Sequence, residues 1–134
     1  MSYFDIMGVA ATGMSAQRIR ISAISSNLAN AQTTKTAEGG PYKRKDVIFQ
    51  TIMEGENSGG VKVDKVVADE KPPLLKYEPQ HPDANEEGYV AYPNINPIEE
   101  MVNMLEASRS YEANTTMLNT AKQLAMRALE IGKA

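Results

Sequence analysis

The chain has 134 residues, of which 42% are hydrophobic, and a net charge of −3 at pH 7. It contains no cysteine and no tryptophan, and its aromatic residues are two Phe and six Tyr. The absence of cysteine excludes disulfides and cysteine-based metal sites. With so few aromatic residues we do not expect a large globular core, and the net charge gives no electrostatic reason to expect nucleic-acid binding.

The start of the chain lacks the features of a secretory signal. Met1-Ser2-Tyr3-Phe4-Asp5 provides no basic segment followed by an apolar segment and a small-residue cleavage site. The apolar runs are also too short for a transmembrane helix. We therefore expect a protein that either stays in the cytoplasm or leaves it by a route that cleaves no signal.

Residues 3–31 predict a long helix with an apolar seam that repeats every seven residues. Charged side chains are sparse there, which indicates that more than one side of the helix is covered. An ordinary amphipathic helix packed on a local core is the alternative. The seam consists of Tyr3, Met7, Ala10, Met14, Gln17, Ile21, Ile24 and Leu28.

The end of this helix is rich in Ser, Asn and Thr, which favour caps and turns. Asn27 and Asn30 are three residues apart and so share one face of the last turn. Two interpretations stay open for them. Asn30 caps the helix within the chain, or both side-chain amides hydrogen-bond to a neighbouring subunit.

Residues 35–95 have the character of a small β-rich insertion that is partly docked on the helices. Turns are predicted at 36–41 and 55–60, and short strands at 47–49, 61–67 and 88–93. In the second strand, Val61, Val63 and Val67 should lie on a different face from Lys62 and Asp64. The proline-rich residues 69–87 are expected to be mostly irregular.

Residues 96–131 predict a second helix, roughly 50 Å long. Asn96 as N-cap, Pro97 at the first helical position and Glu99 three residues after the cap form the strongest helix start in the chain. Its seam is flanked by Met117, Leu124 and Ile131 and is rich in small residues, so partner helices are needed. The seam consists of Met104, Ala107, Tyr111, Asn114, Leu118, Ala121, Ala125 and Ala128.

The sequence therefore predicts a mainly α fold with a small β insertion, divided into an N-terminal helix (1–34), a central segment (35–95) and a C-terminal helix (96–134). The two helices should pair as an antiparallel coiled coil, with ends that are disordered in the isolated protein and fold on assembly. Matching the long amides Gln17 and Asn114 fixes a register. The resulting layers are Leu28 with Met104, Ile24 with Ala107, Ile21 with Tyr111, Met14 with Leu118, Ala10 with Ala121, Met7 with Ala125, and Tyr3 with Ala128.

Catalytic and cofactor chemistry finds little support in the residues. His81 is the only histidine, and a metal site with Asp83 and Glu86 is a weak reading because the loop offers no rigid scaffold. The adjacent carboxylates of 86–87 and 99–100 should diverge, and the basic cluster of residues 43–45 is interpreted as a solvated strand edge. No nucleophile–base pair or nucleotide motif occurs. We expect no enzyme, no cofactor and no small-molecule ligand.

Several segments of the chain form one specific pattern. It begins in Ser26-Asn27-Leu28-Ala29-Asn30 and in Gly39-Gly40-Pro41-Tyr42-Lys43-Arg44-Lys45. It continues in His81-Pro82-Asp83-Ala84, in Gly88-Tyr89-Val90-Ala91-Tyr92-Pro93-Asn94 and in the stretch from Glu106 to Asn114. This pattern covers nearly the whole chain and resembles the bacterial flagellar rod and hook proteins, most of all the C-type proximal-rod members of that family.

This resemblance implies a structural subunit of the hollow flagellar drive shaft. The terminal helices would pack into the inner wall of the rod, and subunits would pass unfolded through the flagellar type III export apparatus without signal cleavage. The implied partners are copies of itself, other proximal- and distal-rod proteins, and the membrane-ring and export-gate components at the rod base. Two alternatives stay open: a distal-rod or hook protein, and a cytoplasmic coiled-coil adaptor.

Overall fold

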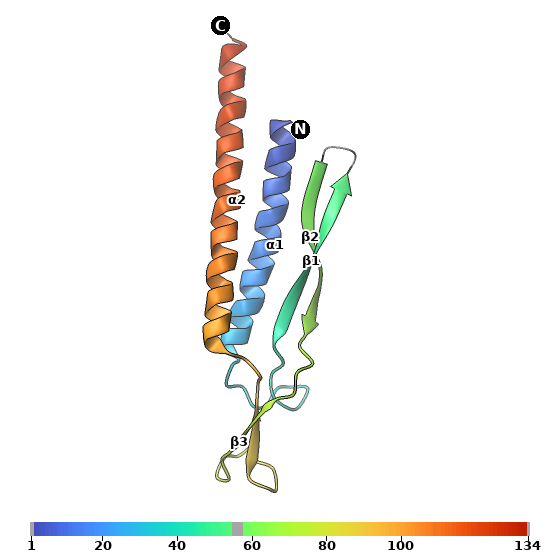
Figure 1. Cartoon of the computed structure of the whole chain (residues 1–134), viewed down its shortest axis with the longest axis vertical. Helices are drawn as coiled ribbons and strands as arrows, with labels where there is room; N and C mark the ends of the chain where they lie inside the picture. The colour runs from blue at the N-terminus through green and yellow to red at the C-terminus, as the bar shows by residue number, and fades with distance from the viewer. Residues whose placement is uncertain (1, 55–57, 134) are drawn as a thin grey trace.

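Two long helices run side by side in opposite directions, and the strands lie between them in the sequence (Figure 1). The structure, a computed structural model, describes residues 2–54 and 58–133. The mainly α fold with a small β insertion is confirmed. The elements in chain order are α1 (Tyr3–Ala29), β1 (Lys45–Glu54), β2 (Ser58–Ala68), β3 (Leu74–Tyr77), β4 (Tyr89–Tyr92) and α2 (Pro97–Ile131).

The helix ends are specified by local hydrogen bonds. Ser2 and Asp5 form a capping box at the start of α1, in which the Asp5 carboxylate accepts from the Ser2 backbone at 2.7 Å. At the start of α2, Asn96 Oδ1 accepts from the backbone N–H of Ile98 at 3.1 Å, and Pro97 takes the first helical position. The start of α2 predicted from the sequence is therefore confirmed.

The larger sheet is a two-stranded hairpin of β1 and β2, longer than predicted. The strands pair from Lys45 with Ala68 to Glu54 with Ser58, with an irregularity between Ile48 and Phe49. Part of the predicted turn at 55–60 was wrong, because Ser58–Gly60 already pair in β2; residues 55–57 lie outside the described residues. The predicted alternation in β2 is confirmed, since the valines of 61, 63 and 67 are half-buried and the side chains of 62 and 64 are exposed.

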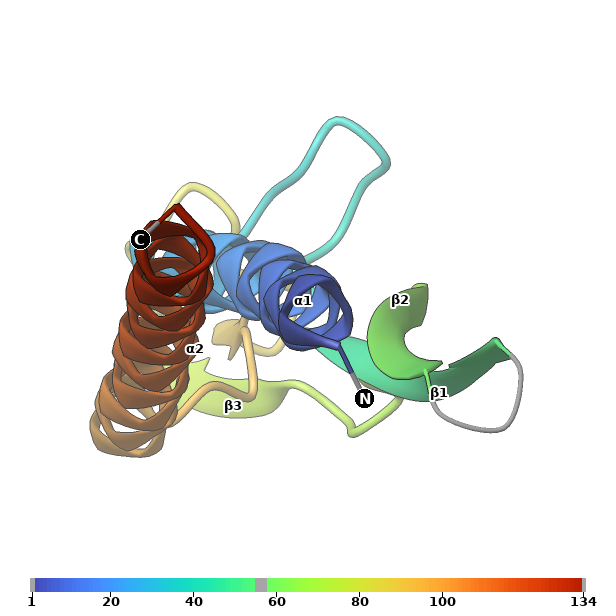
Figure 2. The same cartoon turned by 90° about the horizontal axis from the view of Figure 1, so that it is seen from above.

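The hairpin packs on α1, which lies between it and α2 (Figure 2). The hydroxyl of Thr12 in α1 accepts a hydrogen bond from the backbone N–H of Val61 at 3.2 Å. At Gly60, an added Cβ would stand 3.0 Å from the same hydroxyl oxygen. The absence of a side chain at Gly60 thus lets the strand approach the helix closely.

A second small hairpin pairs β3 with β4, and residues 69–87 are mostly irregular as predicted, since β3 is the one strand among them. Pro72 and Pro73 precede β3 and Pro79 follows it, so the prolines border the strand and remove none of its ladder hydrogen bonds. Tyr77 pairs with Tyr89, and their rings meet edge to face with centroids 5.3 Å apart.

The register of the two helices differs from the prediction by about one helical turn. Asn114 of α2 faces Gly13 of α1, where an added Cβ would stand 2.8 Å from the Asn114 amide nitrogen. Thr115 approaches Met14, with 3.8 Å between its hydroxyl and the sulfur. The amide match of Gln17 with Asn114 was wrong, and Gln17 Oε1 is buried without a hydrogen-bond partner. The long side chain of Asn114 is accommodated by a glycine instead of a second amide.

The contact of Asn114 with Gly13 leads us to expect that the two glycines of α1 differ in their response to substitution. Changing Gly8 to alanine should stabilise the protein by about 1 kcal/mol, because alanine is the better helix former and nothing lies within 4 Å of the added Cβ. Changing Gly13 to alanine should lose this gain, since the new Cβ displaces Asn114. Thermal unfolding of both variants measures the difference, and an equal gain in both would show that Asn114 does not press on Gly13.

Candidate functional site

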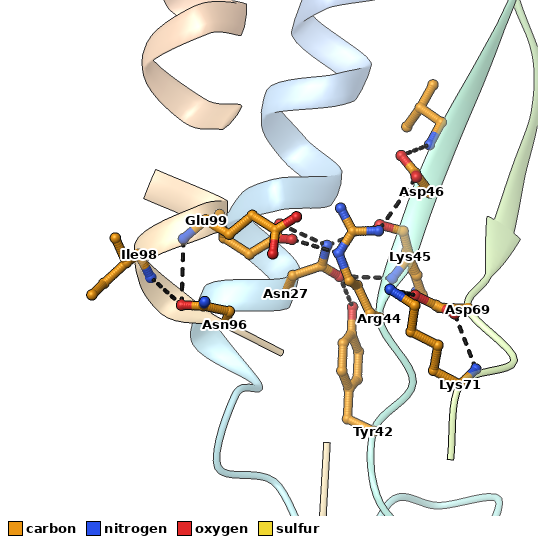
Figure 3. A network of polar contacts seen from close by, with 12 residues as sticks. Asn27, Tyr42, Arg44, Lys45, Asp46, Asp69, Lys71, Asn96, Ile98 and Glu99 are labelled. Carbon is orange, nitrogen blue, oxygen red and sulfur yellow. Dashed lines mark hydrogen bonds and ion pairs between the residues drawn. The ribbon is translucent and has the colours of Figure 1, made fainter. Parts of the chain in front are cut away.

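A buried polar network joins the base of the helix pair to the start of β1 (Figure 3). At its centre is Asn27, in the last turn of α1, whose side chain is 0% exposed. Asn27 pairs with the backbone of Lys45 as a neighbouring strand would: Nδ2 donates to the Lys45 carbonyl at 2.8 Å, and Oδ1 accepts from the Lys45 N–H at 2.8 Å. Oδ1 also accepts from the Tyr42 hydroxyl at 3.1 Å.

Glu100 brings α2 into the same network. It lies one turn after the N-cap Asn96, and its side chain is only 1% exposed. Glu100 Oε2 accepts from Asn27 Nδ2 at 3.1 Å, and Oε1 accepts from Arg44 Nε in an ion pair. We call Asn27, Tyr42, Arg44 and Glu100 the clasp. Because every hydrogen-bonding site of the Asn27 amide is used, the clasp fixes how both helices sit against β1.

The surroundings of Arg44 in the clasp favour its charged form. Burial lowers the pKa of Arg44, but the hydrogen bond and the negative charge of Glu100 outweigh this and raise the pKa above its ordinary value. The carboxylate of Asp46, 3.3 Å from Arg44, adds to the same effect. A buried charge without its partner is costly, so the two ionised groups depend on each other.

Two sequence interpretations change here. The basic cluster of residues 43–45 is not simply a solvated edge, since the Arg44 side chain is largely buried against Glu100, whereas Lys43 and Lys45 are exposed. The Asn27 amide is not kept for a neighbouring subunit, because its hydrogen bonds are all made within the chain.

Asn30 follows the first of its two interpretations and caps α1. Its Nδ2 donates to the carbonyl of Ser26 at 2.8 Å, and its Oδ1 accepts from the hydroxyl of Thr33 at 3.2 Å. Asn27 and Asn30 therefore have different structural roles. Asn27 connects α1 to the rest of the fold, and Asn30 ends the helix.

The expected seam residues of both helices differ in how far the single chain covers them. Tyr3 and Ala128, at the open end of the pair, are exposed. The buried ones are Ala10, Ile24, Ala107 and Ala121, and the half-buried ones are Met7, Met14, Gln17, Ile21, Leu28, Met104, Tyr111, Asn114, Leu118 and Ala125.

The possible metal site of His81 with Asp83 and Glu86 gains no support from the described residues, 2–54 and 58–133. No cluster of His, Asp and Glu there is suited to hold a metal ion, and the ring nitrogen Nδ1 of His81 accepts from the backbone of Asp83 at 3.0 Å in a tight turn. Over the same residues, neither helix combines the length and hydropathy that crossing a bilayer requires.

Comparisons with known proteins agree along the chain. The model of the family described as "Flagella basal body rod protein" matches residues 7–35, and that described as "Flagellar basal body rod FlgEFG protein C-terminal" matches residues 86–131. The flagellar basal-body rod protein FlgC of Bacillus subtilis is 43% identical, over 99% of this chain and 100% of its own length. FlgC of Salmonella typhimurium is 41% identical over the same shares, and FlgC of Borreliella burgdorferi is 41% identical over 98% of each chain.

The chain belongs to the FlgC family of flagellar basal-body rod proteins. Members of this family are structural proteins and not enzymes, which agrees with the interpretation of the residues. The alternatives of a distal-rod or hook protein and of a cytoplasmic coiled-coil adaptor are set aside, because FlgC proteins match nearly the full length. One family model covers α1 from residue 7 onward, and the other covers β4 and the whole of α2, whereas the clasp also requires Tyr42 and Arg44 from the segment between the two matches.

Proposed function

We infer that this protein is a structural subunit of the proximal rod of the bacterial flagellum and that it assembles with other rod proteins of the basal body. Its full-length similarity to FlgC proteins supports this function. The incompletely covered helix pair supports it as well. Apolar side chains such as Ile98 and Ile131 of α2 are 74% and 78% exposed, which is unfavourable in water and suits a chain that is covered by neighbours.

Within the rod, the terminal segments 1–34 and 96–134 have a different role from the central segment 35–95. The two terminal helices pair as a short antiparallel coiled coil and contact neighbouring subunits, through seam residues that the isolated chain covers only in part. The central segment, with its hairpins, faces outward from the rod. Subunits stack helically into a hollow shaft that transmits torque from the motor to the hook and filament.

The route to this location requires no cleaved signal. The chain passes unfolded through the flagellar type III export apparatus and refolds in the periplasm, where the ends of its helices become ordered as it meets its neighbours. Ordering these ends costs backbone entropy that the small residues of the seam offset poorly alone. At the rod base it contacts membrane-ring and export-gate components, and further along it contacts other proximal- and distal-rod proteins and copies of itself.

Deleting the gene from the source bacterium tests this function. We expect non-swimming cells without complete rods, and restoration of swimming by the tagged wild-type chain, which should co-purify with basal bodies. A tagged version that lacks residues 96–134 provides the control for expression without assembly. Swimming cells after the deletion, or a chain that stays in the cytoplasm of complemented cells, would contradict the proposed function.

A further inference from the structure

An apolar groove lies between the start of α1 and the second half of α2, on one side of the helix pair. Its volume is about 730 Å³, and Tyr3, Ile6, Val9, Met117, Ala121 and Leu124 line it. The described residues that line the groove include no charged side chain. Its walls are two helices with small residues between larger ones, a shape into which a third helix can pack.

An apolar helix face lies at the other end of α2. Ile98, Met101, Val102 and Leu105 are between 50% and 74% exposed. They follow the spacing i, i+3, i+4, i+7, by which a helix anchors itself in an apolar groove. We call these four residues the anchor face. The groove and the anchor face are uncharged and of matching character, and neither is covered within the chain.

We propose that the groove receives the anchor face of an adjoining copy of this chain, that is, the first turns of its C-terminal helix. This inference rests on the proposed function and names the partner surface. A second copy carries the anchor face and the exposed Glu99 and Glu106 beside it, because its sequence is the same. The start of α1 offers no comparable face. Within residues 2–18 the exposed large apolar side chains are Tyr3, which already lines the groove, and Phe4.

Charged residues border this contact in a complementary way. Glu99 and Glu106 are exposed and lie beside the anchor face, and Glu106 is also 3.8 Å from Arg20 of its own α1. Arg127 is exposed and follows Leu124, the last lining residue of the groove, by about one turn. When the anchor face enters the groove with the two α2 helices parallel, the Glu106 carboxylate arrives near Arg127 of the receiving subunit.

The positions of the two surfaces also fix the geometry of the contact. The groove and the anchor face are about 17 residues apart along α2, so the adjoining subunit is displaced by roughly 25 Å along the helix axis. Because the surfaces differ and lie at opposite ends, the contact is heterologous and does not close into a dimer. Each subunit receives one neighbour and enters another, as a growing helical assembly requires.

Photo-crosslinking in assembled basal bodies tests the contact. A benzophenone amino acid replaces Met117, which is 53% exposed and lines the groove, or, as the matched control, Met126, which is 54% exposed and outside it. After illumination, basal bodies are purified and the crosslinked peptides are sequenced. We expect position 117, and not position 126, to capture the start of the C-terminal helix of another copy of this chain.

Other outcomes overturn the proposal. They are capture of an N-terminal helix or of any other protein by position 117, or no crosslink although the variant is incorporated into basal bodies. If the probe at 117 blocks incorporation, the probe at Leu124 in the same groove replaces it and is judged by the same outcomes. Absence of the wild-type chain from basal bodies would instead contradict the proposed function, so the two failures are distinguishable.

Discussion

Replacing Glu100 with alanine is expected to destabilise the folded subunit by about 3–5 kcal/mol, the usual cost of removing one partner from a buried ion pair. The Glu100 side chain is 1% exposed, and its loss leaves Arg44 Nε and one N–H of Asn27 without their acceptor, so that Arg44 keeps only the exposed Asp46. Such a loss is a large part of the stability of a small protein. Urea denaturation of the purified chain, followed by circular dichroism, measures it.

The neighbouring Glu99 provides a matched control. It has the same side chain and lies in the same helical turn but is exposed, so its replacement with alanine should change the free energy of unfolding by no more than about 0.5 kcal/mol. Combining Glu100→Leu with Arg44→Met should recover much of the loss, because no unpaired charge then remains buried. Equal effects at positions 99 and 100 would show that the clasp does not stabilise the fold.

Replacing Ala121 with glutamate is expected to abolish rod assembly and swimming. Ala121 is 3% exposed and lies at a close approach of the two helices, where an unpaired carboxylate costs several kcal/mol in desolvation. The protein should still be synthesised, since the change affects folding and assembly and not expression. Swimming in soft agar and immunoblots of cells and basal bodies measure the two effects separately.

Gln123→Glu adds the same charge two residues further along α2, at an exposed position, and should leave swimming intact. The comparison separates the effect of burial from the effect of net charge. Normal swimming of the Ala121→Glu variant would argue that this position is not buried in the assembled rod.

Local signals in the sequence predicted the elements well, and the contacts between distant segments less well. The start of α2 depends on residues within one turn of Asn96, so its bounds followed from the sequence. The helix register depends on contacts such as that of the Asn114 side chain with Gly13. The sequence alone does not distinguish this pairing from the other pairings that the seam allows. Heptad spacing permits registers that differ by one turn, and the amide match chose the wrong one.

The clasp was missed although a signal for it exists. Glu100 precedes Ala107 by seven residues, so the heptad pattern places it in the α2 seam, just before Met104. A charged side chain at such a position needs a buried partner. The basic cluster with Arg44 was the obvious source of that partner. Sequence spacing alone did not connect the two, because 56 residues separate Arg44 from Glu100 and the hairpins between them determine how the chain returns.

The unequal lengths of the two helices give the subunit a direction. α1 has 27 residues and α2 has 35, and the C-terminal end of α2 projects beyond the start of α1 (Figure 1). The other end of the pair is closed by the clasp and continues into the β3–β4 hairpin. A shaft assembled from such subunits in one orientation is polar: one of its ends presents projecting helix tips and the other presents hairpins, so a component that caps or extends one end finds no equivalent site at the other.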